Sequence, residues 1–227
     1  MSDEAANESS NVRRTRRLDR ASVVAAAMGM ADEGGIDGLT MRKLGRSLGV
    51  EAMSLYNHVA NKEDLIDAMV DEVFDMIGDQ IPGEPWREAM TTRAQSTRSV
   101  LRTHPWATPL LDSRTSPGAA TMRHLDATLG CLRNGGFSVP LTAHAIALLD
   151  AYVYGFSLQE AGLPFEGRDE TVDLAEAIME GLGESHPHLA ELVSEHITRE
   201  GYDFADEFDF GLEVVLDGLE RALQPQD

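Results

Sequence analysis

The chain contains 227 residues, of which 42% are hydrophobic, so it can bury the core of one or two globular domains. The single cysteine, Cys131, excludes an internal disulfide framework, and its place in a helical pattern predicts a buried structural thiol. Residues 1–10 are acidic and polar, unlike a secretory signal, and we expect no apolar run long enough to cross a bilayer. The formal net charge of −20 argues against a nucleic-acid partner for the chain as a whole.

The charge is unevenly distributed along the chain. Residues 11–62 carry nine Lys or Arg against five Asp or Glu, whereas the chain from residue 63 onward carries ten basic and 31 acidic residues. The basic part can neutralise phosphates, and the acidic part would weaken non-specific DNA binding through repulsion that salt screens. This asymmetry indicates a nucleic-acid partner for the N-terminal part.

The N-terminal region has three predicted parts. Residues 1–12 are predicted to be a disordered tail, because they are polar and show no apolar pattern. The arginines between 13 and 20 form a basic arm suited to phosphate or minor-groove contact, with a solvated helix start as the alternative. A first helix is predicted over 18–33, and it ends at Gly34-Gly35.

Residues 39–62 are the most informative segment of the sequence. Thr40 is a good N-cap for a short helix, and Gly49 stands where such a helix ends in the left-handed conformation. Glu51 then opens a second short helix, with its negative charge at the positive end of the helix dipole. Two helices joined by a short turn that contains glycine predict a helix-turn-helix, whose second helix enters the DNA major groove.

A connecting helix is predicted over 61–78, because apolar residues recur at every fourth position and Asn61 can cap its start. The segment Pro82-Gly83-Glu84-Pro85 then breaks the chain. We therefore place a helix-turn-helix domain with its connecting helix over 13–80 and a second domain over 81–227.

The second domain is predicted to be helical throughout, because its apolar residues follow helical rather than alternating spacing. Its most apolar helices lie over about 138–161 and 202–223, and both are too apolar for the surface of a monomer. The sequence thus predicts an all-α fold and a homodimer that forms through these two helices.

The segment Leu39 to Lys62 resembles the DNA-binding domain of the TetR family of transcriptional repressors. The family's Leu-Thr, Arg, Leu, Leu-Gly-Val corner, Leu-Tyr, His and Lys all stand at matching positions. The resemblance implies a set of DNA contacts on both helices of the motif and just after them. These residues are Thr40, Arg42, Lys43, Ala52, Met53, Ser54, Tyr56, Asn57, His58 and Lys62. Arg42 and Asn57 are the natural base readers, because Arg pairs with guanine and Asn with adenine.

The C-terminal part resembles the tetracycline-repressor branch of that family, through Asn134-Gly-Gly-Phe-Ser138 and the segment Phe208 to Leu223. The resemblance implies that helices 138–161 and 202–223 pair with their copies in a four-helix bundle. Such a dimer matches a palindromic operator in double-stranded DNA, with recognition helices one DNA turn, about 34–36 Å, apart.

The resemblance also implies that a small-molecule effector binds domain 81–227 and pulls the connecting helix 61–78, so that the protein leaves DNA. The candidate pocket residues are large side chains of the helical body, and plain core packing is the alternative for each. They are Phe74, Trp86, Met90, Trp106, Leu110, Met122, Leu125, Leu129, His144 and Tyr152.

The effector is not expected to be magnesium-tetracycline. The drug-contacting and magnesium-ligating positions of that branch fall on Gly78, Leu111 and Gln159, although Glu160 is adjacent to the last. A hard cation needs oxygen ligands, or at least a donor, at these positions. The His186-Pro-His188 spacing is a weak metal signal, so we expect neither a metal nor a cofactor.

The functional expectation is a dimeric, cytoplasmic repressor that a small hydrophobic molecule releases from its operator. The alternatives are a DNA-binding activator, or a regulator without a ligand, or an all-helical enzyme. The enzyme is disfavoured because the sequence contains no Gly-x-Ser-x-Gly elbow, no phosphate loop and no Cys–His pair with a credible partner. No catalytic residue is therefore assigned.

Overall fold

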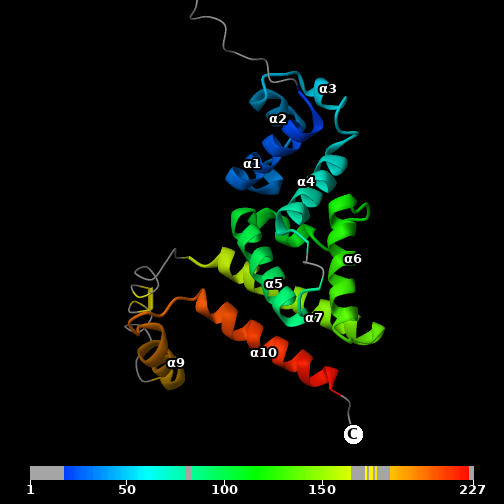
Figure 1. Cartoon of the computed structure of the whole chain (residues 1–227). Coiled ribbons are helices and arrows are strands. Elements are labelled where there is room, and N and C mark those ends of the chain that lie inside the picture. The colour runs from blue at the N-terminus through cyan, green and yellow to red at the C-terminus, as the bar shows by residue number, and fades with distance from the viewer. Residues whose placement is uncertain are drawn as a thin grey trace, which may run out of the picture. The chain divides into compact units, whose positions relative to one another are not determined.

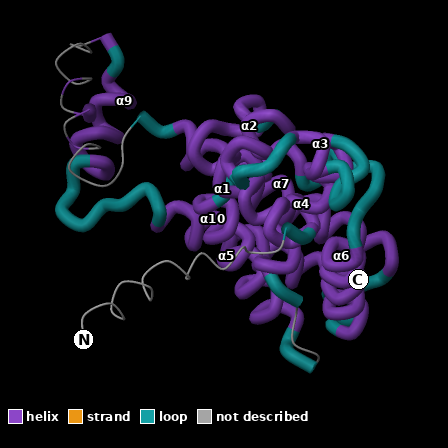
Figure 2. The backbone as a smooth tube through the Cα atoms, turned by 90° about the horizontal axis from the view of Figure 1, so that it is seen from above, coloured by secondary structure: helices purple, strands orange, loops and turns teal. Residues whose placement is uncertain are grey.

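A computed structural model describes residues 18–79, 83–164 and 185–224, together with isolated positions between 172 and 177. The predicted tail, the arginines before residue 18 and most of a short helix expected near 171–181 lie outside these residues. Every regular element in the described part is helical (Figures 1 and 2), which confirms the all-α fold. The elements are α1 Arg20–Gly38, α2 Met41–Ser47, α3 Ala52–Leu55, α4 Lys62–Ile77, α5 Trp86–Thr103, η1 Pro105–Leu110, α6 Ala119–Asn134, α7 Val139–Gly162, α9 Pro187–Leu192, η3 Val193–Ile197 and α10 Asp206–Leu223.

The chain divides into two compact units, Met1–Met69 and Val70–Asp227. The division falls inside α4, so this one helix contributes its first turns to one unit and its last turns to the other. The polypeptide therefore passes from the first unit to the second within this helix.

The first unit is built around α1, which Asp19 and Ser22 start with a reciprocal capping box. The predicted end at Gly34-Gly35 is confirmed, because Gly35 leaves helical geometry, at φ 70° and ψ 166°, and a further helical turn follows to Gly38 across this kink. Glycine adopts a positive φ without strain, so Gly35 ends the first helix and redirects the chain into the short turn that follows. The apolar side of α1 forms the core with later residues: Val23, Val24, Ala27, Met28, Ala31, Leu39, Leu44, Leu55, Val59, Leu65, Ile66 and Met69.

The second unit packs α5, α7 and α10 around one apolar core (Figure 1). The apolar stripe of α10 points into this core, where Phe208, Leu212 and Leu219 are buried. The sequence predicts that the helix over 202–223 contacts a second subunit, but it does not indicate which face of the helix does so. Within the described residues, this stripe packs against α5 and α7, and α10 presents different apolar residues to the surface.

Helix α7 corrects one sequence expectation. It has 24 residues, and by length and composition it is long and apolar enough to cross a bilayer. Its inward face packs in the core of the second unit through Ala145, Leu149 and Val153. Asp150, on the same helix, pairs with a buried arginine of α5. These contacts make α7 a core helix, so its apolar length is no evidence for a membrane.

Candidate DNA interface and regulatory body

The helix-turn-helix forms as the sequence predicts. The Thr40 hydroxyl accepts a hydrogen bond from the Lys43 amide at 3.2 Å, and Gly49 ends α2 with φ 71°. At the corner, the Val50 amide donates to the Gly45 carbonyl at 2.9 Å. A Cβ on Gly45 would lie 2.9 Å from the Val50 carbonyl oxygen and 3.1 Å from the Ala52 nitrogen. Gly45 therefore permits the close approach of the two helices, a role that the sequence pattern had not revealed.

The recognition helix α3 is short, and its two faces differ sharply. Leu55 and the following Val59 are buried at 0% and 2% exposure, and they fix the inner side. Met53 on the opposite side is 75% exposed and Tyr56 is 43% exposed. An exposed large apolar side chain at this place suits contact with a thymine methyl in the major groove.

All ten predicted DNA-contact residues reach the surface of the first unit. Thr40, Arg42, Lys43, Met53, Tyr56 and Asn57 are exposed, and Ala52, Ser54, His58 and Lys62 are partly exposed. Their assignment as contacts remains a prediction, but their placement leaves each one accessible to a DNA duplex.

Arg20, which the sequence grouped with the basic arm, makes contacts inside the first unit. Its guanidinium donates to both carboxylate oxygens of Asp64, at 2.8 and 3.1 Å, and to the His58 carbonyl at 2.9 Å. The hydrogen bond from Arg20 lowers the pKa of Asp64 and raises that of Arg20. The start of α1 is therefore bound to the segment that follows the recognition helix.

In the second unit, the last turns of α4 are hydrogen-bonded to the start of α6. The Asp71 carboxylate accepts from the Thr121 amide at 2.8 Å, from the Thr121 hydroxyl at 2.9 Å and from the Ala120 amide at 3.3 Å. These are N-terminal amides of α6, so a side chain from a different helix provides its cap. Gly118 at the N-cap position leaves room for this carboxylate, which a Cβ would strike.

Arg123 and His124 extend the connection between α4 and α6. Arg123 donates to Asp75 at 2.7 Å and to Asp79 at 2.6 Å. Arg93 of α5 donates through Nε to His124 Nε2 at 3.2 Å, so Nε2 is the acceptor and Nδ1 carries the proton. Nδ1 accordingly donates to the Gly78 carbonyl at 2.7 Å.

His124 is fully buried and held in the neutral form. Burial lowers its pKa, and the positive charge of Arg93 lowers it further. Arg93 is 4% exposed and pairs with Asp150 of α7 at 2.7 Å. One ion pair and two hydrogen bonds thus connect α7 through α5 and α6 to the end of α4.

The predicted pocket residues are dispersed over the second unit. Phe74 packs on the His124 ring, Met90 and Trp106 are buried, and the Tyr152 hydroxyl donates to the Phe208 carbonyl at 2.8 Å. Leu110 and Leu125 are half-buried, while Met122, Leu129 and His144 are exposed. Their role in a pocket remains a prediction.

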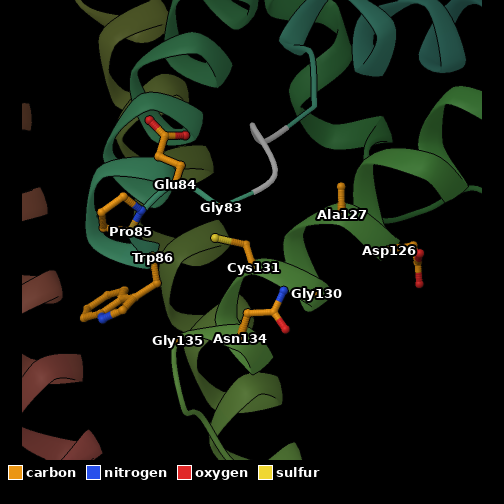
Figure 3. Close-up of a pocket in the computed structure, with 10 residues that line it drawn as sticks. All are labelled: Gly83, Glu84, Pro85, Trp86, Asp126, Ala127, Gly130, Cys131, Asn134 and Gly135. Carbon is orange, nitrogen blue, oxygen red and sulfur yellow. The ribbon is translucent and has the colours of Figure 1, made fainter.

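A cleft of about 560 Å³ lies between the start of α5 and the C-terminal half of α6 (Figure 3). Trp86 is the predicted pocket residue that lines it, and Cys131 extends from α6 toward the segment that carries Glu84 and Pro85. Burial raises the pKa of the Cys131 thiol, which keeps it protonated and poorly nucleophilic. This agrees with the expected structural thiol, although Cys131 is only partly buried.

In the described residues, the positions that match the magnesium-tetracycline ligands of the tetracycline-repressor branch do not form a set of metal ligands. Gly78 and Leu111 offer no side-chain oxygen or nitrogen ligand, and Leu111 is 6% exposed. Glu160, the carboxylate next to Gln159, receives two hydrogen bonds from Arg98, at 2.6 and 3.0 Å. Among the residues described, no group of three or more His, Cys, Asp or Glu side chains could hold a metal ion.

An all-α chain in which a helix-turn-helix leads through one long helix into a helical bundle defines a DNA-binding regulator of transcription. Residues 23–69 match the family of bacterial regulatory proteins called the tetR family, and residues 81–223 match the tetracyclin repressor-like C-terminal domain. The chain belongs to the TetR family of transcriptional regulators, which are DNA-binding proteins and not enzymes.

Relatives and solved structures agree with this assignment. The chain is 34% identical to the transcriptional repressor DrrR1 of Streptomyces coeruleorubidus, over 91% of this chain and 78% of that protein. It is 35% identical to the class D tetracycline repressor of Escherichia coli, over 63% of this chain and 67% of the repressor. The structure of ActR of Streptomyces coelicolor in complex with actinorhodin matches with a TM-score of 0.74 and 28% identity, covering 91% and 97% of the two chains.

Proposed function

We propose that the protein is a dimeric repressor that leaves a palindromic operator when a small hydrophobic molecule binds domain 81–227. The observation that carries the proposal is the placement of α4. This helix begins at Lys62, a predicted DNA contact, and its last turns are bonded to α6 through Asp71, Asp75 and Gly78. An effector that displaces α6 would therefore move α4, and through it the recognition helix.

The proposed dimer forms through the outer faces of α7 and α10. Small residues recur at every fourth position on the exposed side of α7: Ala143, Ala147, Ala151 and Gly155. Phe210 and Val214 are 71% and 53% exposed on α10. Small residues let two helices approach closely, and exposed aromatic residues are typical anchors of interfaces. A second copy of this chain would cover both faces.

The proposed effector is a small molecule other than magnesium-tetracycline. The support is the chemistry at Gly78, Leu111 and Gln159, together with the engagement of Glu160 by Arg98. ActR, a structural relative, was solved with actinorhodin bound. A helical body of this kind accommodates an organic molecule, and we expect the effector site to lie among the apolar side chains of the second unit. We also expect the protein to be cytoplasmic.

The test begins with selection of bound sequences from random double-stranded DNA, followed by a thermal-shift screen of antibiotics and lipophilic metabolites. We expect a palindromic site with half-sites one turn apart and at least one compound that raises Tm. That compound should weaken operator binding by roughly 5–150-fold, the usual range of allosteric coupling. Selection of no sequence, or binding of a compound with no effect on DNA affinity, would refute the corresponding part of the proposal.

A further inference from the structure

The segment after the recognition helix has little regular structure to hold it. Helix α3 ends at Leu55, a turn follows over 56–58, and α4 begins only at Lys62. A four-residue helix cannot fix its own position, because helix formation becomes favourable only over several turns. Two predicted DNA contacts, His58 and Lys62, lie in or beside this segment.

Contacts from other parts of the first unit fix the backbone of this segment. Arg20 donates to the His58 carbonyl at 2.9 Å, and Asp64 accepts from the Ala60 amide at 2.7 Å. The two side chains join each other through both carboxylate oxygens, at 2.8 and 3.1 Å. Asn61 accepts from the Asp64 amide at 2.9 Å and so orients the first turn of α4. The backbone on both sides of Val59 is therefore bound to one bidentate ion pair.

We propose that Arg20 and Asp64 are positioning residues for operator recognition, which act by holding the His58–Lys62 backbone against the first turn of α1. This inference rests on the proposed function as a sequence-specific DNA binder. The planar guanidinium matches a carboxylate in two parallel hydrogen bonds, and this geometry specifies an orientation. An exposed ion pair contributes little to stability by itself. We expect the Arg20–Asp64 pair instead to affect how accurately the helix-turn-helix is positioned against the base edges of the operator.

The competing explanation is that Arg20 contacts a DNA phosphate directly. The two explanations predict opposite effects for Asp64→Asn. Removal of a negative charge near DNA should tighten binding if Arg20 acts only as a cation, because phosphate attraction increases. If the pair positions the segment, the same change should weaken binding to the selected operator.

The experiment measures affinity of the full-length protein for its selected operator and for a scrambled duplex, at one salt concentration. We expect Asp64→Asn to lose roughly tenfold in operator affinity, comparable to the loss of one base contact, with unchanged or tighter binding to the scrambled duplex. Arg20→Lys retains the charge but not the bidentate geometry, and it should show the same loss of discrimination.

Glu51→Gln is the matched control. Glu51 is exposed at the start of α3 and makes no side-chain capping hydrogen bond to the described residues. The change removes one negative charge near the same DNA without touching Arg20 or Asp64. It should leave the ratio of operator to scrambled affinity unchanged.

Hydrogen exchange at the Ala60 amide provides a readout that does not depend on DNA. Exchange should accelerate in both Asp64→Asn and Arg20→Lys while the global unfolding transition keeps its midpoint. Operator affinity equal to or tighter than wild type in Asp64→Asn overturns the inference alone. A wild-type protein that selects no sequence overturns the proposed function and this inference together.

Discussion

The corner of the helix-turn-helix depends on the missing side chain of Gly45. This residue lies inside α2, where glycine is normally unfavourable by roughly 0.5–1 kcal/mol relative to alanine. The close approach of the Val50 carbonyl and the Ala52 backbone explains why glycine occupies it. At the residue scale, packing space therefore overrides helix propensity.

Gly45→Ala is expected to destabilise the protein by about 1–3 kcal/mol, because the added Cβ lies 2.9 Å from a backbone oxygen that cannot rotate away. Urea unfolding measures the loss, and operator binding should weaken with it. Gly29→Ala is the control: Gly29 lies inside α1 with nothing within 4 Å of the added Cβ, so this change should be neutral or stabilising. Equal effects of the two changes would contradict the steric explanation.

His124 should make stability depend on pH. The pKa of His124 is lowered in the folded protein, mainly by burial. Its contribution to the free energy of unfolding is therefore fully present above the unfolded pKa of 6.5. The contribution is lost as pH falls below 6.5 toward the lower folded pKa, since the unfolded chain then binds the proton more readily. The free energy of unfolding of wild type should therefore fall more steeply than that of His124→Gln between pH 7.5 and 5.5. Parallel curves for the two proteins would show that His124 does not titrate in this way.

The connection between α4 and α6 operates at the scale of whole elements. Helix α4 supplies Asp71 to the start of α6, and α6 supplies Arg123 and His124 to the end of α4. Because these bonds lie along one helix face, displacement of α6 cannot leave α4 in place without breaking several of them. The two helices therefore move together or separate at a cost.

Asp71→Ala is expected to lower the free energy of unfolding by about 1–2 kcal/mol, similar to the loss of an ordinary N-cap. The reason is that the Ala120 and Thr121 amides lose their acceptor. Chemical denaturation of the full chain measures this difference. Asp75→Ala serves as the comparison, since Asp75 is exposed and pairs with Arg123 at the surface, where ion pairs contribute about 0–1 kcal/mol. The explanation fails if the Asp75 variant is destabilised as much as the Asp71 variant.

At the scale of the molecule, one face of α10 is buried in the core and the opposite face carries the proposed dimer contact. Phe208 and Leu212 complete the core of the second unit, whereas Phe210 and Val214 remain exposed on the opposite side. If the proposed interface is correct, substitutions on the two faces should alter the stability of one subunit and its association with a second copy independently.

Phe210→Lys is expected to convert a dimer into monomers, because it places a charge where the proposed interface buries an aromatic ring. Sedimentation equilibrium should show the lower mass, circular dichroism should remain unchanged, and affinity for a two-half-site operator should fall. Met76→Lys introduces the same charge at an exposed apolar residue of α4 and should leave the mass unchanged. A Phe210→Lys protein that sediments like wild type would place the interface elsewhere.

The sequence by itself determined the features that local contacts specify. Thr40, Gly49 and Asn61 act on residues within a few positions of themselves, so their caps and turns could be predicted from the pattern alone. The all-α class followed for the same reason, since a helix repeats its contacts every three or four residues.

Only the tertiary structure decided which residues far apart in sequence meet. Arg20 and Asp64 are 44 positions apart, Asp71 and Thr121 are 50 apart, and Arg93 and Asp150 are 57 apart. It also decided which face of α10 is buried, because apolar stripes occur on both sides and only packing against α5 and α7 distinguishes them. Contacts of this kind depend on how helices pack, and helical periodicity carries no information about the identity of the partner.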